Sequence, residues 1–237
     1  MTLSSPRVEA DEDVTITAVV EDADTPVDAL TYEWSSSSAK GVFVGQGRQV
    51  RWTAPHLQAT PDLYTLTLNV TENYTDSTTN EAKQFKVSRS VDVHYNDSYR
   101  DLSRISMRFL TELFPNVSVT PQQAVQDFSD NCPGKFAERD EIAVNRRLFR
   151  IESGTFAISS ISLNPPKTSA TVVGACVFKD TVLATGVKET VSGICTLKGV
   201  YEDWTWLLCD STFAGTGTIT SPSALAGRVP GRIISPR

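Results

Sequence analysis

Three aspartates in one short segment form the densest group of potential metal ligands in the sequence. Asp22, Asp24 and Asp28 lie between two apolar stretches. Carboxylates spaced two residues apart in a loop can converge on Ca²⁺, which takes roughly six to eight oxygen ligands. Aspartates in turns also accept hydrogen bonds from nearby backbone, so an ordinary solvated turn is the alternative. Glu72 and Asp76, in a later loop, would be further ligands at the same end.

Five acidic residues in the second half are candidates for acid–base chemistry. They are Asp127, Asp130, Glu138, Asp140 and Glu141. Apolar burial would raise the pKa of such a carboxyl group towards neutrality, although a solvated charge on a helix is the ordinary interpretation. The second half has no histidine, the commonest general base, and the chain has no phosphate loop or Gly-x-Ser-x-Gly elbow. We therefore assign no catalytic residue and expect binding rather than catalysis.

All four cysteines lie in the second half, at Cys132, Cys176, Cys195 and Cys209. No Cys-x-x-Cys pair occurs, which argues against zinc and leaves two disulfides or four buried thiols. A turn at residues 201–203 would place Cys195 opposite Cys209 in a hairpin, at a separation that a disulfide can bridge. Among the three pairings available, we prefer Cys195–Cys209 together with Cys132–Cys176.

The composition is that of a folded protein with room for two hydrophobic cores. The chain has 237 residues, 40% of them hydrophobic and 21% charged. Its net charge of −6 argues against a nucleic-acid binder. No apolar run reaches the ~18–20 residues of a membrane-spanning helix, and the first residues contain no signal-peptide core. We expect a periplasmic, secreted or cell-surface protein whose signal or lipoprotein anchor precedes this sequence, with a cytoplasmic location as the alternative.

Two patterns of hydrophobicity predict the elements that carry these residues. The first half alternates with period two, in strands separated by turn-rich segments, which is typical of a β-sandwich. Trp34 and Trp52 are expected to pack between its sheets, with an exposed platform for a sugar as the alternative. The expected strands cover residues 14–20, 30–34, 49–53, 63–70 and 85–94.

The second half begins with helices and continues with long strands. Helical periodicity covers residues 99–114, a second helix starts at Thr120-Pro121 and carries Ala124, Val125 and Phe128, and a third covers about 136–147. This order predicts an α+β domain with helices packed on a curved antiparallel sheet. We expect domains at 1–96 and 97–214 and a flexible tail at 215–237. The expected strands of this half cover residues 154–163, 170–178, 188–200 and 205–213.

The first half resembles polycystic-kidney-disease-like (PKD-like) and bacterial immunoglobulin-like repeats. Residues 20–34 carry Asp-x-Asp, a further Asp and then Leu-Thr-Tyr-x-Trp, and residues 50–55 and 64–70 match later strands of the family. The resemblance covers residues 5–95. The Trp-Asp-Phe-Gly-Asp-Gly form of some members is absent, since four serines follow Trp34. The resemblance implies an immunoglobulin-like sandwich that acts as an extracellular spacer or binding module.

The second half resembles the nuclear-transport-factor-2-like cone, which belongs to the cystatin-like folds and is shared with ketosteroid-isomerase-like enzymes. The resemblance covers residues 98–213 and is carried by Glu138-Arg139-Asp140-Glu141-Ile142, by Asn145-Arg146-Arg147 and by the closing strand at 204–213. It implies a pocket between helices and sheet, where the enzyme members use an acid to move a proton. No Asp-Tyr-Asp constellation of the enzymes can be placed on this sequence.

These features together predict a non-catalytic extracytoplasmic binding or adhesion protein. The sandwich would be a spacer, stabilised by Ca²⁺ as the one expected cofactor, and the cone would bind a small apolar ligand, a protein or a glycan. One alternative is an enzyme that uses the cone pocket for proton transfer. Another is a structural protein that dimerises through the C-terminal sheet. A buried carboxylate facing an open pocket would favour the enzyme, and a pocket filled by its own apolar side chains would favour binding.

Overall fold

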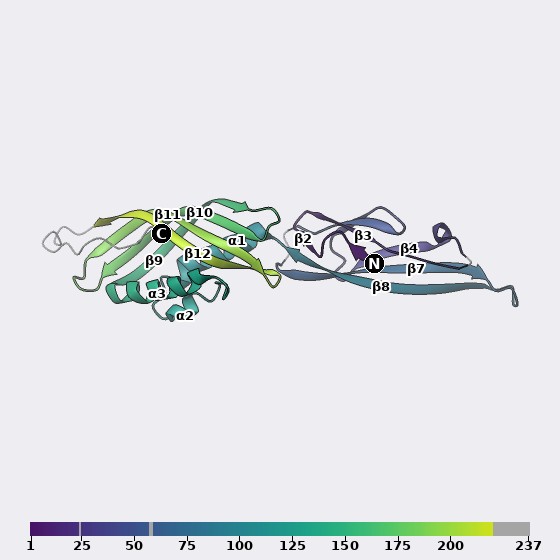
Figure 1. Ribbon diagram of the computed structural model, residues 1–237, viewed down its shortest axis with the longest axis horizontal. Coiled ribbons are helices and arrows are strands. Elements are labelled where there is room, and N and C mark those ends of the chain that lie inside the picture. The colour runs from purple at the N-terminus through teal and green to yellow at the C-terminus, as the bar shows by residue number, and fades with distance from the viewer. Residues whose placement is uncertain (24, 57–58, 220–237) are drawn as a thin grey trace. The chain divides into compact units, whose positions relative to one another are not determined.

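The buried apolar residues of the chain gather in two separate clusters. The computed structural model describes residues 1–23, 25–56 and 59–219. The chain divides into one unit over Met1–Ser98 and a second unit that begins at Tyr99. Trp52 belongs to the first cluster, the partly buried Trp34 packs against that cluster, and Trp206 belongs to the second. Two interiors are therefore present, and Figure 1 labels many of the helices and strands of the two units.

The first unit contains two four-stranded sheets. One has the strand order β1-β3-β6-β5 and the other has the order β2-β8-β7-β4. The only parallel pairing among these strands joins β2 to β8. A 3₁₀ helix, η1 (Val27–Ala29), precedes β4. The strand bounds are β1 Thr2–Leu3, β2 Arg7–Glu9, β3 Asp13–Thr17, β4 Thr31–Ser36, β5 Val42–Val44, β6 Gln49–Thr53, β7 Asp62–Thr75 and β8 Ala82–Asn96.

Aromatic side chains from both sheets fill the first interior. Trp52 on β6 is fully buried, and its ring centroid lies 5.2 Å from that of Tyr64 on β7. Tyr64 in turn meets Tyr95 on β8 edge to face at 5.7 Å. Gly41 has a φ of +78°, and a Cβ at that position would overlap the Trp52 indole. The expected core role of Trp52 is confirmed, while the immunoglobulin-like assignment of this unit stays a prediction.

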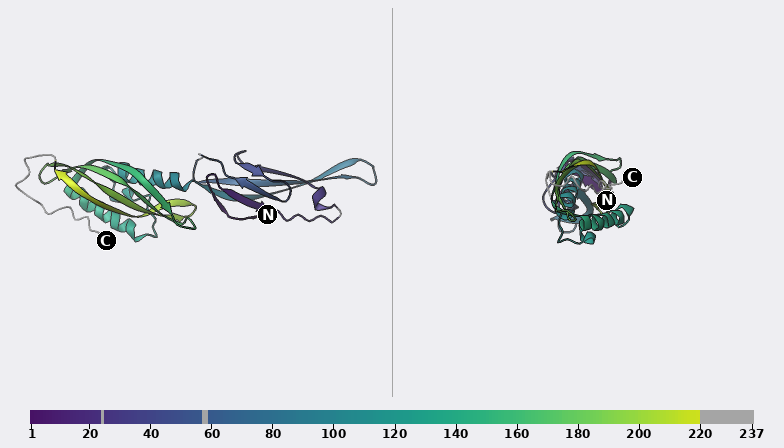
Figure 2. Two further views of the ribbon diagram at one scale, coloured as in Figure 1. Left: turned by 90° about the horizontal axis from the view of Figure 1, so that it is seen from above. Right: turned by 90° about the vertical axis from the view of Figure 1, so that its left-hand side faces the viewer.

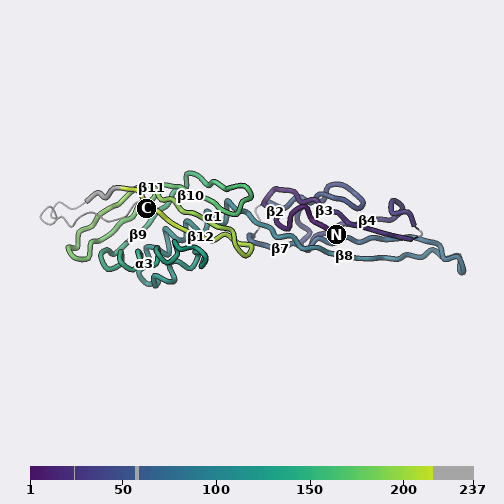
Figure 3. The backbone as a smooth tube through the Cα atoms, viewed as in Figure 1, coloured from purple at the N-terminus to yellow at the C-terminus, as the bar shows by residue number. Residues whose placement is uncertain are grey.

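Strands β7 and β8 continue as a two-stranded hairpin beyond the end of β4. β4 pairs with β7 only as far as Thr71, but β7 and β8 stay paired to Thr75 and Ala82 (Figure 3). The sequence predicts a loop over residues 71–80, whereas only the turn near Asp76 lies outside the strands. Asp76 accepts hydrogen bonds from the backbone N–H groups of Thr78 (2.8 Å) and Thr79 (3.2 Å), which closes that turn.

The second unit places its helices before a four-stranded antiparallel sheet of order β12-β11-β10-β9. Helix α3 packs against β12 and β9, along one side of the curved sheet (Figure 2). The α+β organisation predicted for this half is confirmed. Among the described residues, no helix is long and apolar enough to cross a membrane. The bounds are α1 Ser98–Arg108, π-helix η2 Phe109–Leu113, α2 Pro121–Ala124, α3 Pro133–Leu148, β9 Phe149–Leu163, β10 Ser169–Val182, β11 Lys188–Glu202 and β12 Thr205–Ile219.

Helix α2 begins where the sequence predicts and ends sooner. The Thr120 hydroxyl accepts a hydrogen bond from the Gln123 backbone N–H, and the Gln123 side chain accepts one from the Thr120 backbone, forming a capping box. The expected helix includes Phe128, but the chain beyond Ala124 pairs with β12 instead. Leu208 donates its N–H to the Asp127 carbonyl at 2.8 Å. These β-type bonds satisfy the backbone that would otherwise continue the helix.

Strand β12 is longer than the sequence predicts. The flexible tail was expected from residue 215, yet residues 215–219 pair with β11, from Gly215↔Gly193 to Ile219↔Glu189. This part of the tail prediction is wrong because β11 supplies ladder partners to a stretch that has little apolar character of its own. The rest of the predicted tail, residues 220–237, lies outside the described residues.

Candidate functional site

A cavity of about 80 Å³ lies inside the second unit, between η2, α3 and strands β10 to β12. This volume has room for roughly five or six water molecules, or for a ligand of similar size. The phenyl rings of its wall contact one another, with centroids 5.3 Å apart for Phe114 and Phe178 and 6.0 Å apart for Phe178 and Phe213. The apolar wall consists of Phe109, Leu110, Phe114, Phe178, Leu197 and Phe213.

The polar side of the cavity comes mainly from helix α3. Glu138, Glu141 and Asn145 are spaced i, i+3 and i+7, which places them on one face of a helix. Ser211 and Thr212 on β12 complete this side. Among the described residues that line the cavity, the ionisable side chains are therefore Glu138 and Glu141.

Glu138 is the buried functional group of the site. Its residue surface is 9% exposed. The Ser211 hydroxyl donates a hydrogen bond to Glu138 Oε2, and Oε1 has no hydrogen-bond partner among the described residues. Burial raises the pKa of Glu138 from 4.5 to about 8; the charges of Glu141 and Asp210 raise it too, and the Ser211 hydrogen bond opposes them. Near neutral pH the carboxyl group is therefore largely protonated.

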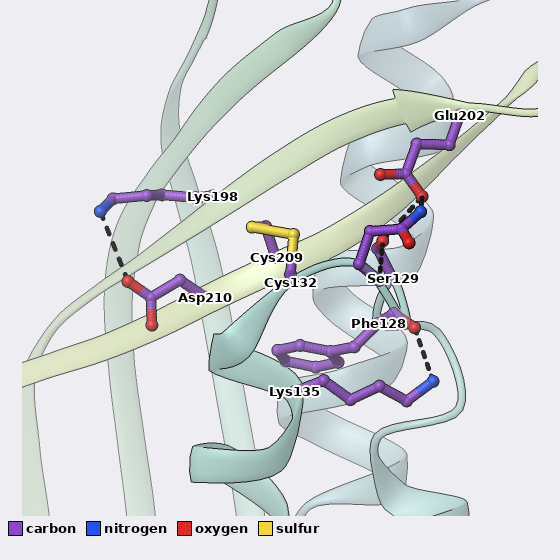
Figure 4. Close-up of a disulfide and its surroundings, with 9 residues drawn as sticks. Phe128, Ser129, Cys132, Lys135, Lys198, Glu202, Cys209 and Asp210 are labelled. Atoms are coloured by element: carbon purple, nitrogen blue, oxygen red, sulfur yellow. Dashed lines mark hydrogen bonds and ion pairs between the residues drawn. A yellow bond between two sulfur atoms is a disulfide. The ribbon is translucent and has the colours of Figure 1, made fainter.

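A β-bulge in β12 decides which of its side chains face the cavity. Gly199 pairs with Leu208 but Lys198 pairs with Asp210, so Cys209 is an extra residue on β12. Because of the extra residue, the side chains that follow it point to the opposite faces of the sheet from those that a regular strand would give them. Beyond it Ser211 lies opposite the buried Leu197, while Asp210 faces the other side of the sheet and forms an ion pair with Lys198 at 3.4 Å (Figure 4).

A disulfide fixes helix α3 to that bulge. Cys132, the residue before α3, is bonded to Cys209 on β12, with their Cα atoms 5.2 Å apart (Figure 4). Gly134 permits the close approach, because a Cβ there would overlap the Cys209 carbonyl oxygen. The second disulfide joins Cys176 on β10 to Cys195 on β11, and Cys195 lines the cavity. Two covalent links therefore hold the helix and the strands that form the site.

All four cysteines are bonded in disulfides, but the preferred pairing of Cys195 with Cys209 and Cys132 with Cys176 is wrong. The β11–β12 turn consists of Asp203 and Trp204, since Glu202 pairs with Thr205. The expected turn at 201–203 is thus displaced, and the bulge adds one further residue to the count. Cys195 consequently faces Phe213 rather than Cys209.

Arg146 holds η2, the π-helix that carries Phe109 and Leu110, in place. Its guanidinium donates hydrogen bonds to the carbonyl groups of Leu113 (3.1 Å) and Phe114 (3.2 Å), and also to that of Val119. Burial lowers the pKa of Arg146. The sequence predicts an uninterrupted α-helix here; π-helical turns are uncommon and often occur at functional sites.

The structure brings only two of the five candidate acids to the cavity, Glu138 and Glu141. Asp127 forms an ion pair with Arg108 at 3.3 Å. Two exposed side chains pair with residues of α3: Asp130 with Lys135 at 2.7 Å and Asp140 with Arg139 at 2.7 Å. The position of Ser211 at the cavity could not be predicted from the sequence, because the bulge determines which way its side chain points. Asn145 was part of the segment that carries the resemblance to the cone, but its place beside the cavity was not predicted.

The acidic loop proposed for calcium is described only in part. Asp24 lies outside the described residues. Asp22 accepts a hydrogen bond from the Thr25 N–H at 2.9 Å, and the Thr25 hydroxyl donates to Glu72, so that loop and Glu72 do meet. Asp28 lies in η1. No cluster of three or more His, Cys, Asp or Glu side chains suited to a metal occurs within the described residues, and the calcium site stays a prediction.

Comparisons with known proteins give only distant structural likenesses. No protein-family model matches the chain, and no curated protein sequence matches it. A conserved protein from Planctomyces limnophilus is 14% identical, with a TM-score of 0.41, over 50% of this chain and 97% of its own. A Mycobacterium tuberculosis protein of unknown function is 16% identical, with a TM-score of 0.38, over 50% of this chain and 71% of its own. A hexachlorocyclohexane dehydrochlorinase, LinA type 2, is 9% identical, with a TM-score of 0.39, over 57% of this chain and 93% of its own. These likenesses assign neither a family nor an activity to the chain.

Proposed function

We propose that the second unit binds a small ligand in the cavity beside Glu138, as part of a non-catalytic extracytoplasmic binding protein. The observation that carries this proposal is the Glu138 carboxyl group. It is nine-tenths buried, lines a cavity with phenyl walls, and leaves Oε1 without a hydrogen-bond partner among the described residues. The Oε1 atom keeps some accessible surface, so a ligand or a water molecule in the cavity can reach it and complete its hydrogen bonding.

The lining of the cavity also supports a ligand. Small-molecule sites combine an apolar wall with a few fixed polar groups. Here Ser211 of β12 orients Glu138 through a hydrogen bond. Arg146 holds η2 in position, and the Cys132–Cys209 disulfide holds α3. The volume of about 80 Å³ limits the bound portion to a compound or substituent of a few heavy atoms.

Several features favour an extracytoplasmic location and a spacer role for the first unit. Disulfides persist in oxidising compartments, and the described part of the chain carries two. The first unit has two sheets around an aromatic interior, as a PKD-like or immunoglobulin-like spacer would. Its resemblance to those repeats supports the same role.

A second candidate function is proton transfer at Glu138, on the pattern of the ketosteroid-isomerase-like enzymes. Two observations favour it. A buried carboxyl group faces an open cavity, which is the arrangement expected of the enzyme, and its pKa of about 8 lets the group give or take a proton near neutral pH. Against it, the described residues that line the cavity include no second acid–base group other than Glu141. Exchange of carbon-bound protons of a bound ligand with D₂O, lost in Glu138→Gln, would favour the enzyme.

Ligand binding can be tested by ¹H–¹⁵N NMR with fragments of about five or six heavy atoms that carry positive, neutral or negative charge. Because the cavity is preformed, we expect at least one charge class to shift the amide resonances of Glu138, Ser211 and Phe213. Glu138→Leu should weaken that binding at least tenfold, whereas Asp140→Asn, on the same helix but outside the cavity, should not. If no charge class shifts these resonances, the proposal is wrong.

A further inference from the structure

The charges around the cavity restrict the class of ligand. Neither Glu138 nor Glu141 has a basic ion-pair partner among the described residues. The basic side chains of α3 at Lys135, Arg139 and Arg146 bond to other groups, namely Asp130, Asp140 and backbone carbonyls. The polar side of the cavity therefore contains two carboxyl groups without an opposing charge.

The groups that act electrostatically on Glu138 come from two elements. Glu141 lies on α3, the same helix as Glu138. Asp210 lies on β12 and forms an ion pair with Lys198 of β11. η2 and β10 contribute only phenyl and alkyl groups to the wall. A positive charge placed at Oε1 would thus meet carboxylates on one side and phenyl faces on the other.

Both the carboxyl groups and the phenyl rings of the cavity attract a cation. A cation donates charge-assisted hydrogen bonds to a carboxylate, which are about twice as strong as neutral ones. A cation near a phenyl ring is attracted by the negative face of the ring, most strongly where water is excluded. An anion would meet two carboxyl groups with no basic residue to offset them.

We propose that the ligand of this cavity is a small organic cation, an ammonium group on a short apolar chain, held by Glu138 and Glu141 through the ammonium and by Phe114, Phe178 and Phe213 through the chain. This inference rests on the proposed ligand-binding function and specifies its ligand class. The ammonium would donate to the Glu138 Oε1 that has no partner, and the chain would displace water from the phenyl wall.

Binding of such a cation is coupled to the ionisation of Glu138. An alkylammonium titrates near ~10.4, as a lysine side chain does, and so stays charged throughout the relevant range. Glu138, with a pKa of about 8, is about one-tenth ionised at about pH 7 and about nine-tenths ionised at about pH 9. If the cation binds the ionised form, its affinity should rise about tenfold between these two pH values.

The test compares n-butylammonium, 1-butanol and butanoate on the full chain by ¹H–¹⁵N NMR titration at about pH 7 and about pH 9. We expect n-butylammonium to bind most tightly and to gain about tenfold in affinity at the higher pH. Glu138→Gln should weaken its binding at about pH 9 by at least tenfold and remove the pH dependence, Glu141→Gln should weaken it less, and Asp140→Asn should leave it unchanged.

The outcomes separate this inference from the function on which it rests. If 1-butanol or butanoate binds the cavity more tightly than n-butylammonium, the proposal of a cationic ligand is wrong, but the proposed ligand-binding function still stands. Equal affinity of n-butylammonium for the parent chain and Glu138→Gln would also overturn the proposal of a cationic ligand. Failure of all three probes to shift the cavity resonances would overturn both proposals.

Discussion

The chain buries two glutamates to nearly the same degree and partners them differently. In the first unit Glu9 is 8% exposed; Arg7 donates to Oε1, and the Ser98 N–H (2.9 Å) and hydroxyl (2.8 Å) donate to the carboxylate. In the second unit Glu138 is 9% exposed, and its hydrogen-bond partner among the described residues is the Ser211 hydroxyl. Burial by itself therefore does not mark a functional carboxyl group. The missing base and the adjoining cavity distinguish Glu138 from a structural ion pair.

The largest expected effect is the pH dependence of stability at Glu138. Its pKa is raised in the folded state, from 4.5 to about 8. The stability linked to the bound proton is therefore fully present below about pH 4.5 and is lost as pH rises through about pH 8. Glu138→Gln should match the parent chain near about pH 4 and exceed its free energy of unfolding by about 5 kcal/mol near about pH 9.

Urea unfolding of both chains across this pH range measures the difference. Asp140→Asn, which removes a carboxylate from the exposed side of the same helix, should show no such divergence. A constant difference between Glu138→Gln and the parent chain at all pH values would mean that Glu138 is not protonated in the folded state at neutral pH.

The second expected effect is a loss of stability that is confined to the second unit when its disulfides are removed. All four cysteines lie in the second unit, and the Cys132–Cys209 disulfide spans 77 residues. By loop-closure entropy, replacing this pair with alanine should cost about 4 kcal/mol in the unfolding of the second unit, against about 3 kcal/mol for Cys176 and Cys195, which lie 19 residues apart.

Hydrogen exchange followed by mass spectrometry can measure these losses, and the amides of β3, β6 and β7 in the first unit should keep their protection. Peptide mapping without reduction tests the pairing itself. A peptide that links Cys195 to Cys209 would contradict the structure and remove the attachment of α3 to the bulge.

The third expected effect is at Glu9, the buried glutamate that forms an ion pair with Arg7. Glu9→Gln leaves the largely buried Arg7 guanidinium without its carboxylate, which should cost about 3 kcal/mol in the unfolding of the first unit. Urea unfolding of the two chains checks this, and a stabilisation like that expected for Glu138→Gln would abolish the contrast between the two residues.

The sequence correctly predicted the class of most elements. Period-two alternation located β6 and most of β7 and β8, and helical periodicity with the Thr120-Pro121 start located α1 and α2. Short strands such as β1 and β5 were missed because two or three residues show no periodicity. The acid at Glu138 was among five candidates, since its spacing on a helix does not reveal which face another element covers.

What the sequence determined by itself was the local pattern: alternating strands, then helices, then strands again, with all four cysteines in the second half. The tertiary structure alone decided the disulfide pairing, the direction of Ser211 and the burial of Glu138. The physical reason is that one extra residue at Cys209 shifts every later side chain of β12 to the opposite face. A bulge arises from pairing between strands and from the attachment of α3, and no local residue preference at 209 encodes it.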